Sequence, residues 1–248
     1  MERCGSLANP RPYADRLELQ WSVDQLSRTD RLLGHEIARH ATKIALECRK
    51  VATTSGSSLS FLGIAGSLRR ASYNRGLIRA AMEAAPDGIS VVPYELAQIP
   101  MFNADVESGG DPPAVADFKR AIAAADALLI ATPEYNHCVP GVLKNAIDWA
   151  SRPARQSVLT GKPVAIMGAS TGRGGTARAQ AHLRDGLAYT NGFVLPLPEV
   201  LVDFAGEKFD PDGNLTDDET QREMRDLLVS LATWTRRLGR EGDTAVAS

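Results

Sequence analysis

The sequence has few of the features that mark secreted, membrane-spanning or nucleic-acid-binding proteins. Its three cysteines, Cys4, Cys48 and Cys138, include no CxxC pair, which argues against a disulfide framework or a zinc ribbon. No apolar run reaches the roughly 18 residues of a membrane span, and the N-terminus lacks the apolar stretch of a secretory signal. Charge is balanced, with 28 Lys and Arg against 30 Asp and Glu, so no excess recruits nucleic acid or an anionic membrane. We therefore expect a cytoplasmic protein with neither a nucleic-acid nor a membrane partner.

What is present suits a globular protein with a substantial core. The chain has 248 residues, of which 44% are hydrophobic, enough for one large domain or two small ones. From residue 58 onwards, apolar runs alternate with amphipathic stretches. Residues 58–240 are therefore predicted to form the main domain, and residues 241–248 a flexible tail.

Residues 1–57 differ from the rest in composition and hydrophobic pattern. They are predicted to be an N-terminal extension, partly helical or disordered. Residues 24–50 carry apolar side chains at roughly helical spacing, whereas the following TTSGSS has the composition of a linker. A segment of this size with so few large apolar groups would not be stable alone. It must dock on the main domain, fray or contact a partner, unless translation naturally starts downstream of it.

The alternation of strand and helix patterns after residue 58 predicts a doubly wound α/β fold. Continuous apolar strands between amphipathic helices are typical of a parallel sheet covered on both faces. The predicted strands are 59–65, 89–94, 127–131, 164–168 and 194–201. The predicted helices are 74–85, 112–125, 142–151, 176–187 and 216–238. This pattern indicates a flavodoxin-like five-stranded parallel sheet with strand order 2-1-3-4-5.

In such a sheet a ligand lies beyond the carboxyl ends of the strands, near the point where the strand order reverses. The loop after the first strand holds the hydroxyls of Ser67 and Ser72, the guanidinium groups of Arg69 and Arg70, and the start of a helix near Asn74. Together with the positive end of the helix dipole, these groups suit a phosphate. The loop lacks the GxxxxGK[ST] pattern of a Walker loop. The alternative is that Ser72 or Asn74 merely caps the helix while both arginines are solvated.

The loop after the third strand suits a flat heterocycle. It is stiffened by Pro133 and Pro140. Pro133 and Tyr135 can supply apolar contacts, and Asn136 with nearby backbone N–H groups can bond the polar edge of a ring. The alternative is a plain surface turn that leads into an amphipathic helix with Trp149 in the core.

Three segments follow one another in the main domain: GSLRRASYN at 66–74, ATPEYNHCVPGVLKNAIDWASRP at 131–153 and GASTGRGGTARAQAHLR at 168–184. In this order and spacing they resemble the NADPH-dependent FMN reductase family, particularly its chromate- and quinone-reductase branch. The resemblance covers residues 58–240. It implies a flavodoxin-like fold, non-covalently bound FMN, NADPH or NADH as the reductant, and a homodimer or homotetramer.

The resemblance also implies which residues hold FMN. In the first loop, the residues that would hold its phosphate are Ser67, Arg69, Ser72 and Asn74. In the second loop, the residues that would line the isoalloxazine ring are Pro133, Glu134, Tyr135 and Asn136. The residues that would form the third wall are Ser170, Gly172 and Gly175.

The chain departs from the family pattern around the expected substrate pocket. His137 and Cys138 stand where family members often have Tyr or Gly, then Ser or Gly. These two residues and Arg70 are expected in the substrate pocket. Arg69 and Arg70 are both candidates for the NADPH 2′-phosphate. Arg178 and Glu199 match positions that pair across subunits in tetrameric members, although an alanine replaces the aromatic that usually accompanies them. We expect an oligomer interface there and leave dimer or tetramer open.

Other kinds of catalytic site are less well supported by the sequence. GASTG at 168–172 matches the GxSxG nucleophile elbow, yet the only histidine after Ser170 is His182 and no acid lies between them, so the hydrolase triad cannot be assembled in its usual order. A Cys138 nucleophile beside an imidazole is less favoured than a thiol that lines the pocket. The remaining histidines lack companion ligands, so no metal is predicted.

We therefore predict an oxidoreductase that passes electrons from NADPH through the flavin N5 to a small acceptor such as a quinone, chromate, an azo compound or free flavin. The flavin carries the chemistry, so no catalytic side chain is predicted. The alternative is a non-enzymatic flavin-binding protein or an electron-transfer flavodoxin. Flavodoxins tend to be strongly acidic, whereas a net charge of −2 and two arginines in the phosphate loop favour the enzyme.

Overall fold

The computed structural model describes residues 58–246 of the chain. The predicted N-terminal extension, with Cys4, Cys48, His35 and His40, lies outside the described residues. In the described part of the chain, no helix combines the length and the apolar character needed to cross a membrane.

A parallel sheet with strand order β2-β1-β3-β4-β5 forms the centre of the fold, and a sixth strand, β6, pairs with β4. The strands are β1 (Leu59–Ala65), β2 (Ile89–Tyr94), β3 (Ala127–Ala131), β4 (Pro163–Ala169), β5 (Phe193–Val194) and β6 (Val200–Val202). Every residue of β3 and β4 is buried, which explains their continuous apolar sequences. The predicted flavodoxin-like class and the order 2-1-3-4-5 are confirmed.

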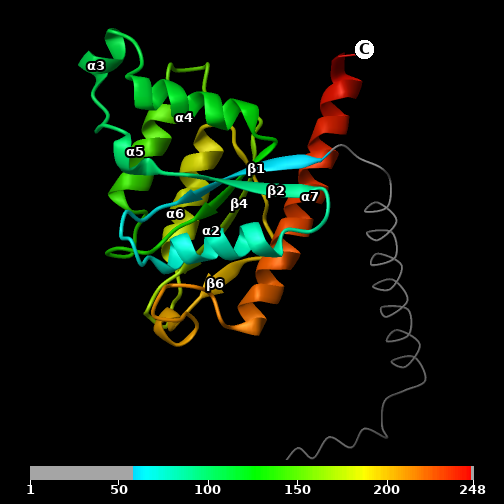
Figure 1. Ribbon diagram of the computed structural model, residues 1–248. Coiled ribbons are helices and arrows are strands. Elements are labelled where there is room, and N and C mark those ends of the chain that lie inside the picture. The colour runs from blue at the N-terminus through cyan, green and yellow to red at the C-terminus, as the bar shows by residue number, and fades with distance from the viewer. Residues whose placement is uncertain (1–57, 247–248) are drawn as a thin grey trace, which may run out of the picture. The chain divides into compact units, whose positions relative to one another are not determined.

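Helices cover both faces of the sheet (Figure 1). The helices are α2 (Tyr73–Ala84), α3 (Ala104–Ser108), α4 (Pro113–Ala124), α5 (Gly141–Ala150), α6 (Ala177–Tyr189) and α7 (Asp218–Val246), with short 3-10 helices η2 (Leu96–Gln98) and η3 (Ala205–Glu207). Leu129 of β3 faces the core beneath α2 and α7, and its neighbour Ile130 faces the core beneath α4, α5 and α6. Successive side chains of a strand point to opposite faces, so each apolar strand serves both cores.

The predicted strand 194–201 is two short strands in the structure. Both pair with β4, β5 through Val194 and β6 through Leu201. Pro196 and Pro198 lie between them, and proline has no N–H to donate to a strand ladder. The chain therefore leaves the edge of the sheet and rejoins it at β6, close to the loop that follows β4.

The last helix differs from its prediction at both ends. The Asp217 carboxylate accepts hydrogen bonds from the Thr220 backbone N–H at 2.8 Å and from its hydroxyl at 2.7 Å, so α7 begins at Asp218 with an aspartate as its cap. The helix continues to Val246. Residues 241–246 of the predicted tail are thus helical.

Candidate functional site

The loops after β1, β3 and β4 meet at the carboxyl edge of the sheet and enclose a cavity of about 260 Å³. The residues that line it are Ser67, Arg69, Ser72, Tyr73, Asn74, Pro133, Glu134, Tyr135, Ala169, Ser170 and Thr171. The structure thus brings all three predicted loops together. The predicted FMN-binding residues Asn136, Gly172 and Gly175 belong to the same loops but do not line this cavity.

The N-terminal end of α2 leaves polar groups unpaired at the cavity. Ser72 is at the N-cap position and only 2% exposed, yet its side chain makes no capping hydrogen bond with the described residues. The first N–H groups of a helix have no partner within the helix. Ser67, which is also buried, accepts a long hydrogen bond of 3.4 Å from the Arg69 N–H. Uncapped N–H groups and two hydroxyls at a positive helix end form a site for an anion.

Tyr73 orients the guanidinium group beside this anion site. Arg69 lies over the Tyr73 ring, with 5.2 Å between its guanidinium carbon and the ring centroid. The Tyr73 ring in turn packs on Phe209 at a centroid distance of 4.9 Å. A cation held over an aromatic face loses less freedom when it binds an anion. Arg70, the neighbour in sequence, is exposed and does not line the cavity.

Asn74 joins two elements of the site to each other. Its Nδ2 donates to the Ala169 carbonyl and its Oδ1 accepts from the Ala169 N–H, both at 2.9 Å. The side chain is buried. These two bonds tie the first turn of α2 to the end of β4, so the structure shows Asn74 as a support of the site. Its contact with a phosphate stays a prediction.

A tight hairpin at residues 135–138 forms the second wall. The Cys138 N–H donates to the Tyr135 carbonyl at 3.0 Å, and the Tyr135 N–H donates back at 3.3 Å. Between them, Asn136 and His137 have φ of 51° and 59°, as a type I′ turn requires, and asparagine tolerates this conformation well. Tyr135 is 52% exposed, and its hydroxyl lies 3.4 Å from the Ser67 hydroxyl. The tyrosine therefore links the first two walls.

Glu134 directs its carboxylate towards α6. Its Oε2 accepts hydrogen bonds from the backbone N–H groups of Arg178 at 3.0 Å and Ala179 at 3.1 Å, and its Oε1 lies 3.0 Å from His137 Nδ1. Burial alone would raise the pKa of Glu134, but the bonds from His137, Ala179 and Arg178 outweigh burial and lower the pKa below its usual value. The carboxylate is therefore ionised at neutral pH.

The loop after β4 forms the third wall. The Ser170 N–H donates to the Val202 carbonyl at 2.9 Å, and the Ser170 hydroxyl accepts from the Gly172 N–H at 3.1 Å. Gly175 has a φ of 52°, and a Cβ there would lie 3.1 Å from the Leu201 backbone, so glycine is required. His182 is exposed on α6. The described residues give Ser170 no histidine partner, which argues further against a hydrolase.

The two predicted interface residues have partners within the chain. Arg178 is exposed, and its Nη1 lies 2.9 Å from His137 Nδ1. Glu199 is 3.9 Å from Arg184, a distance too long for a hydrogen bond. Cys138 is an exposed free thiol. In residues 58–246, no group of His, Cys, Asp and Glu side chains could hold a metal ion.

The walls fit FMN in both of its chemical parts. The buried, uncapped Ser72 and the open first turn of α2 fit its phosphate, and the exposed Tyr135 with Pro133 fits its flat ring. Tyr73 and Thr171 also line the cavity, although neither was predicted from the sequence. Tyr73 stands four residues after Arg69 of the phosphate loop. This spacing was the sequence feature that could have pointed to the contact between the two side chains. Thr171 gave no distinct signal.

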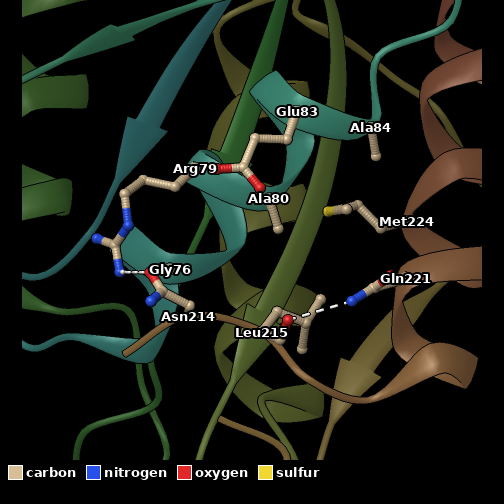
Figure 2. Close-up of a pocket in the computed structure, with 9 residues that line it drawn as sticks. All are labelled: Gly76, Arg79, Ala80, Glu83, Ala84, Asn214, Leu215, Gln221 and Met224. Atoms are coloured by element: carbon tan, nitrogen blue, oxygen red, sulfur yellow. Dashed lines mark hydrogen bonds between the residues drawn. The ribbon is translucent and has the colours of Figure 1, made fainter. Parts of the chain in front are cut away.

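A second cavity of about 270 Å³ lies on the flank of α2, beside the start of α7 (Figure 2). The guanidinium of Arg79 donates to the Gly213 carbonyl at 2.7 Å, and the Gln221 amide donates to the Leu215 carbonyl at 3.1 Å. Both groups tie the turn before α7 to the rest of the domain. Of the polar side chains that line this cavity, Arg79, Asn214 and Gln221 are therefore already bonded within the chain.

Comparison with known proteins agrees with this geometry. The family model of NADPH-dependent FMN reductases matches residues 59–207. An NAD(P)H-dependent FMN reductase of Pseudomonas aeruginosa is 49% identical over 180 residues, which cover 73% of this chain and 97% of that protein. A 2-hydroxy-1,4-benzoquinone reductase of Burkholderia sp is 43% identical over 72% of this chain and 97% of its own length.

One solved structure is similar in both sequence and fold. FerB of Paracoccus denitrificans, a flavoenzyme NAD(P)H:(acceptor) oxidoreductase, superimposes with a TM-score of 0.66 at 32% identity, covering 72% of this chain and 98% of FerB. The family match spans more than half of the chain and includes all three walls of the cavity. The chain belongs to the NADPH-dependent FMN reductase family.

Proposed function

We propose that the protein is an FMN-dependent oxidoreductase that passes electrons from NADPH to a small acceptor. The observation that carries this proposal is the uncapped first turn of α2 beside the Tyr135 hairpin, because it places an anion site next to an exposed aromatic surface. FMN has a phosphate at one end and a flat ring at the other. Relatives named as NAD(P)H-dependent FMN reductase and quinone reductase support the same activity.

The first wall would hold the phosphate. The hydroxyls of Ser67 and Ser72 can donate to phosphate oxygens, and the first N–H groups of α2 can do the same. Arg69, held over Tyr73, can add a charge-assisted hydrogen bond. Charge-assisted bonds contribute about 1.5–3 kcal/mol each, so this wall would supply much of the affinity for the cofactor.

The second and third walls would hold the ring. Pro133 and Tyr135 offer apolar surface, Asn136 can bond a polar edge, and the loop of Ser170 would bound the opposite side. FMN, when bound, supplies the chemistry of hydride acceptance from the nicotinamide and electron delivery to the acceptor. The residues of the chain then hold the ring and the reactants in contact. They need not act as acid or base.

The acceptor that the site supports best is a quinone. Tyr135 of the cavity wall is 52% exposed, and Leu68, which stands between the cavity-lining Ser67 and Arg69, is 51% exposed, so both offer apolar surface to solvent. Flat, partly apolar molecules suit such a surface. We place His137, Cys138 and Arg70, all exposed, on the substrate side. Chromate, azo compounds and free flavin are the acceptors to compare with quinones.

We further propose a cytoplasmic homodimer or homotetramer with Arg178 and Glu199 at its interface. Both side chains are exposed in the single chain, as contact with a second copy requires. The exposed free thiol of Cys138 suits a reducing compartment. Light scattering on the purified protein tests the assembly: a dimer or tetramer is expected, and a monomer at micromolar concentration contradicts it.

The first test is a visible absorption spectrum of the protein loaded with FMN, desalted, and then treated with NADPH without oxygen. We expect the flavin bands to remain after desalting and to bleach when NADPH is added. Release of the flavin during desalting contradicts the cofactor assignment. Retained flavin that stays oxidised contradicts the reductase and favours an electron-transfer flavodoxin.

A further inference from the structure

We propose that Glu134 is a positioning residue that fastens the 135–138 hairpin to the first turn of α6. On this proposal its carboxylate does not touch FMN or substrate but fixes the wall that carries Tyr135. The expected effect on FMN binding rests on the proposed function, since the hairpin that Glu134 fastens is the wall that would hold the flavin ring.

The carboxylate is fully engaged within the protein. One oxygen accepts two backbone N–H groups of α6, from Arg178 at 3.0 Å and Ala179 at 3.1 Å, and the other meets His137 Nδ1 at 3.0 Å. Only 11% of the Glu134 side chain is exposed. Two of these partners are backbone N–H donors, and His137 is a third donor when its Nδ1 carries the proton, so the carboxylate has little capacity left for a ligand.

Helix α6 depends on this carboxylate for its cap. Its own N-cap residue, Thr176, makes no side-chain capping bond. Glu134 takes that place from a loop more than forty residues earlier in the chain. An anion at a helix N-terminus satisfies unpaired N–H groups and interacts favourably with the helix dipole. The cap therefore also joins two parts of the site that are distant in sequence.

The hairpin is fastened at a second point, through His137. Its Nδ1 lies 3.0 Å from Glu134 Oε1 and 2.9 Å from Arg178 Nη1. A single ring nitrogen either donates or accepts, so it donates to Glu134 or accepts from Arg178. In either state the hairpin is bonded to its surroundings. Asn136 and His137 have positive φ, which such bonds help to maintain.

The consequence falls on Tyr135, which directly follows Glu134. The tyrosine reaches the first wall, where its hydroxyl lies 3.4 Å from Ser67. Glu134, the residue before it, is bonded to the first turn of α6, beside the third wall. These bonds hold the backbone next to Tyr135 in place. Loss of the carboxylate would leave the tyrosine free to move with the hairpin, and a ring surface that moves binds FMN less tightly.

Three substitutions of Glu134 distinguish the length of its side chain from its charge. In Glu134→Gln one carbonyl oxygen can still accept both N–H groups of α6 although the charge is lost. In Glu134→Asp the charge remains, but the side chain is one methylene shorter and cannot reach both groups. In Glu134→Ala both are lost. A residue that acted on a ligand through its charge would give the opposite order for Gln and Asp.

The experiment measures two quantities on the full chain at 25 °C: the FMN dissociation constant, from flavin fluorescence, and the exchange rates of the Arg178 and Ala179 amide hydrogens in the apo protein. For Glu134→Gln we expect both to stay within about threefold of wild type. For Glu134→Asp and Glu134→Ala we expect at least about a tenfold weaker FMN affinity, together with at least about tenfold faster exchange of these two amides.

A matched control separates positioning from the general loss of a helix cap. Asp217 also caps a helix with its carboxylate, since it accepts from the Thr220 N–H in the first turn of α7, outside the cavity. Asp217→Ala should lower the unfolding temperature as Glu134→Ala does, and should leave FMN affinity unchanged. The proposal is overturned if Asp at 134 restores FMN affinity while Gln does not, or if amide exchange stays unchanged in Glu134→Ala. It is also overturned if Glu134→Ala keeps its FMN affinity.

Failure of the proposed function would look different. If the wild-type protein bound no FMN, the amide-exchange rates of the apo protein would still report whether Glu134 fastens the hairpin to α6. If the wild type bound FMN but NADPH did not reduce it, both readouts would remain measurable.

Discussion

Two cavities of nearly equal size border α2: about 260 Å³ at its N-terminal end and about 270 Å³ along its flank (Figure 2). On the flank, Arg79 and Gln221 bond backbone carbonyls of the same chain. At the N-terminal end, the buried Ser72 leaves its helix uncapped, and Arg69 stacks on Tyr73 without an anionic partner among the described residues. Size therefore does not distinguish the two cavities. They differ in their polar groups: those at the N-terminal cavity are unpaired, and a ligand can bond them.

The largest effect is expected when the N-terminal cavity is made to resemble the flank. In Ser72→Asp a carboxylate would cap α2, take up its N–H groups and repel a phosphate. We expect FMN affinity to fall at least about 100-fold, or about 2.7 kcal/mol, with the unfolding temperature unchanged or higher. Fluorescence titration with FMN checks this. Equal affinity in wild type and variant would contradict the phosphate assignment.

A smaller loss is expected from Arg69→Ala. Removal of the guanidinium over Tyr73 deletes one charge-assisted bond to the phosphate, so FMN affinity should fall about 10- to 30-fold in the same titration. Arg69→Lys keeps the charge but lacks the planar guanidinium group, so its FMN affinity should lie between those of wild type and Arg69→Ala. If riboflavin, which has no phosphate, loses as much affinity as FMN, then Arg69 does not contact the phosphate.

On the flank the expected effect is on stability alone. Arg79→Ala removes the 2.7 Å bond to the Gly213 carbonyl and should lower the free energy of unfolding by about 1–2 kcal/mol in urea titrations. FMN affinity should stay within about twofold of wild type. A clear loss of FMN affinity would mean that the flank cavity is coupled to the site.

The smallest effect concerns pH. Because the pKa of Glu134 lies below its ordinary value of 4.5 in the folded protein, its contribution to stability is present above pH 4.5 and is lost as the pH falls through the lowered value. We expect the unfolding temperature of wild type to drop more steeply below pH 4.5 than that of Glu134→Gln. Parallel curves for the two proteins would show that the α6 cap does not depend on the charge.

Much of the fold could be predicted because strands that are buried in the fold must consist of apolar residues, and such runs are visible in the sequence. The apolar runs of β1, β3 and β4 have to be apolar on both faces of a covered parallel sheet, and the loops that follow them must then meet at one edge. The edge of the sheet was less predictable. A single run from 194 to 201 reads as one strand, but its prolines divide it into β5 and β6.

The hydrogen-bond partners of side chains within the site were the least predictable part. Glu134 was expected at the flavin ring; it lines the cavity and also caps α6. Asn74 was expected at the phosphate and bonds the backbone of Ala169. Arg178, whose place at a subunit interface stays a prediction, also contacts His137 within the chain. In each case the bonding partner lies at least forty residues away, so local sequence carries no sign of it.

The class of the fold, the order of the sheet and the three loops of the site follow from the order of the residues along the chain, because hydrophobic burial and glycine or proline chemistry act on neighbouring residues. Which polar groups in those loops are already bonded, and which can still bind a ligand, depends on the folded arrangement. A hydrogen bond requires a distance of about 3 Å between two atoms, and only folding brings atoms of distant residues that close.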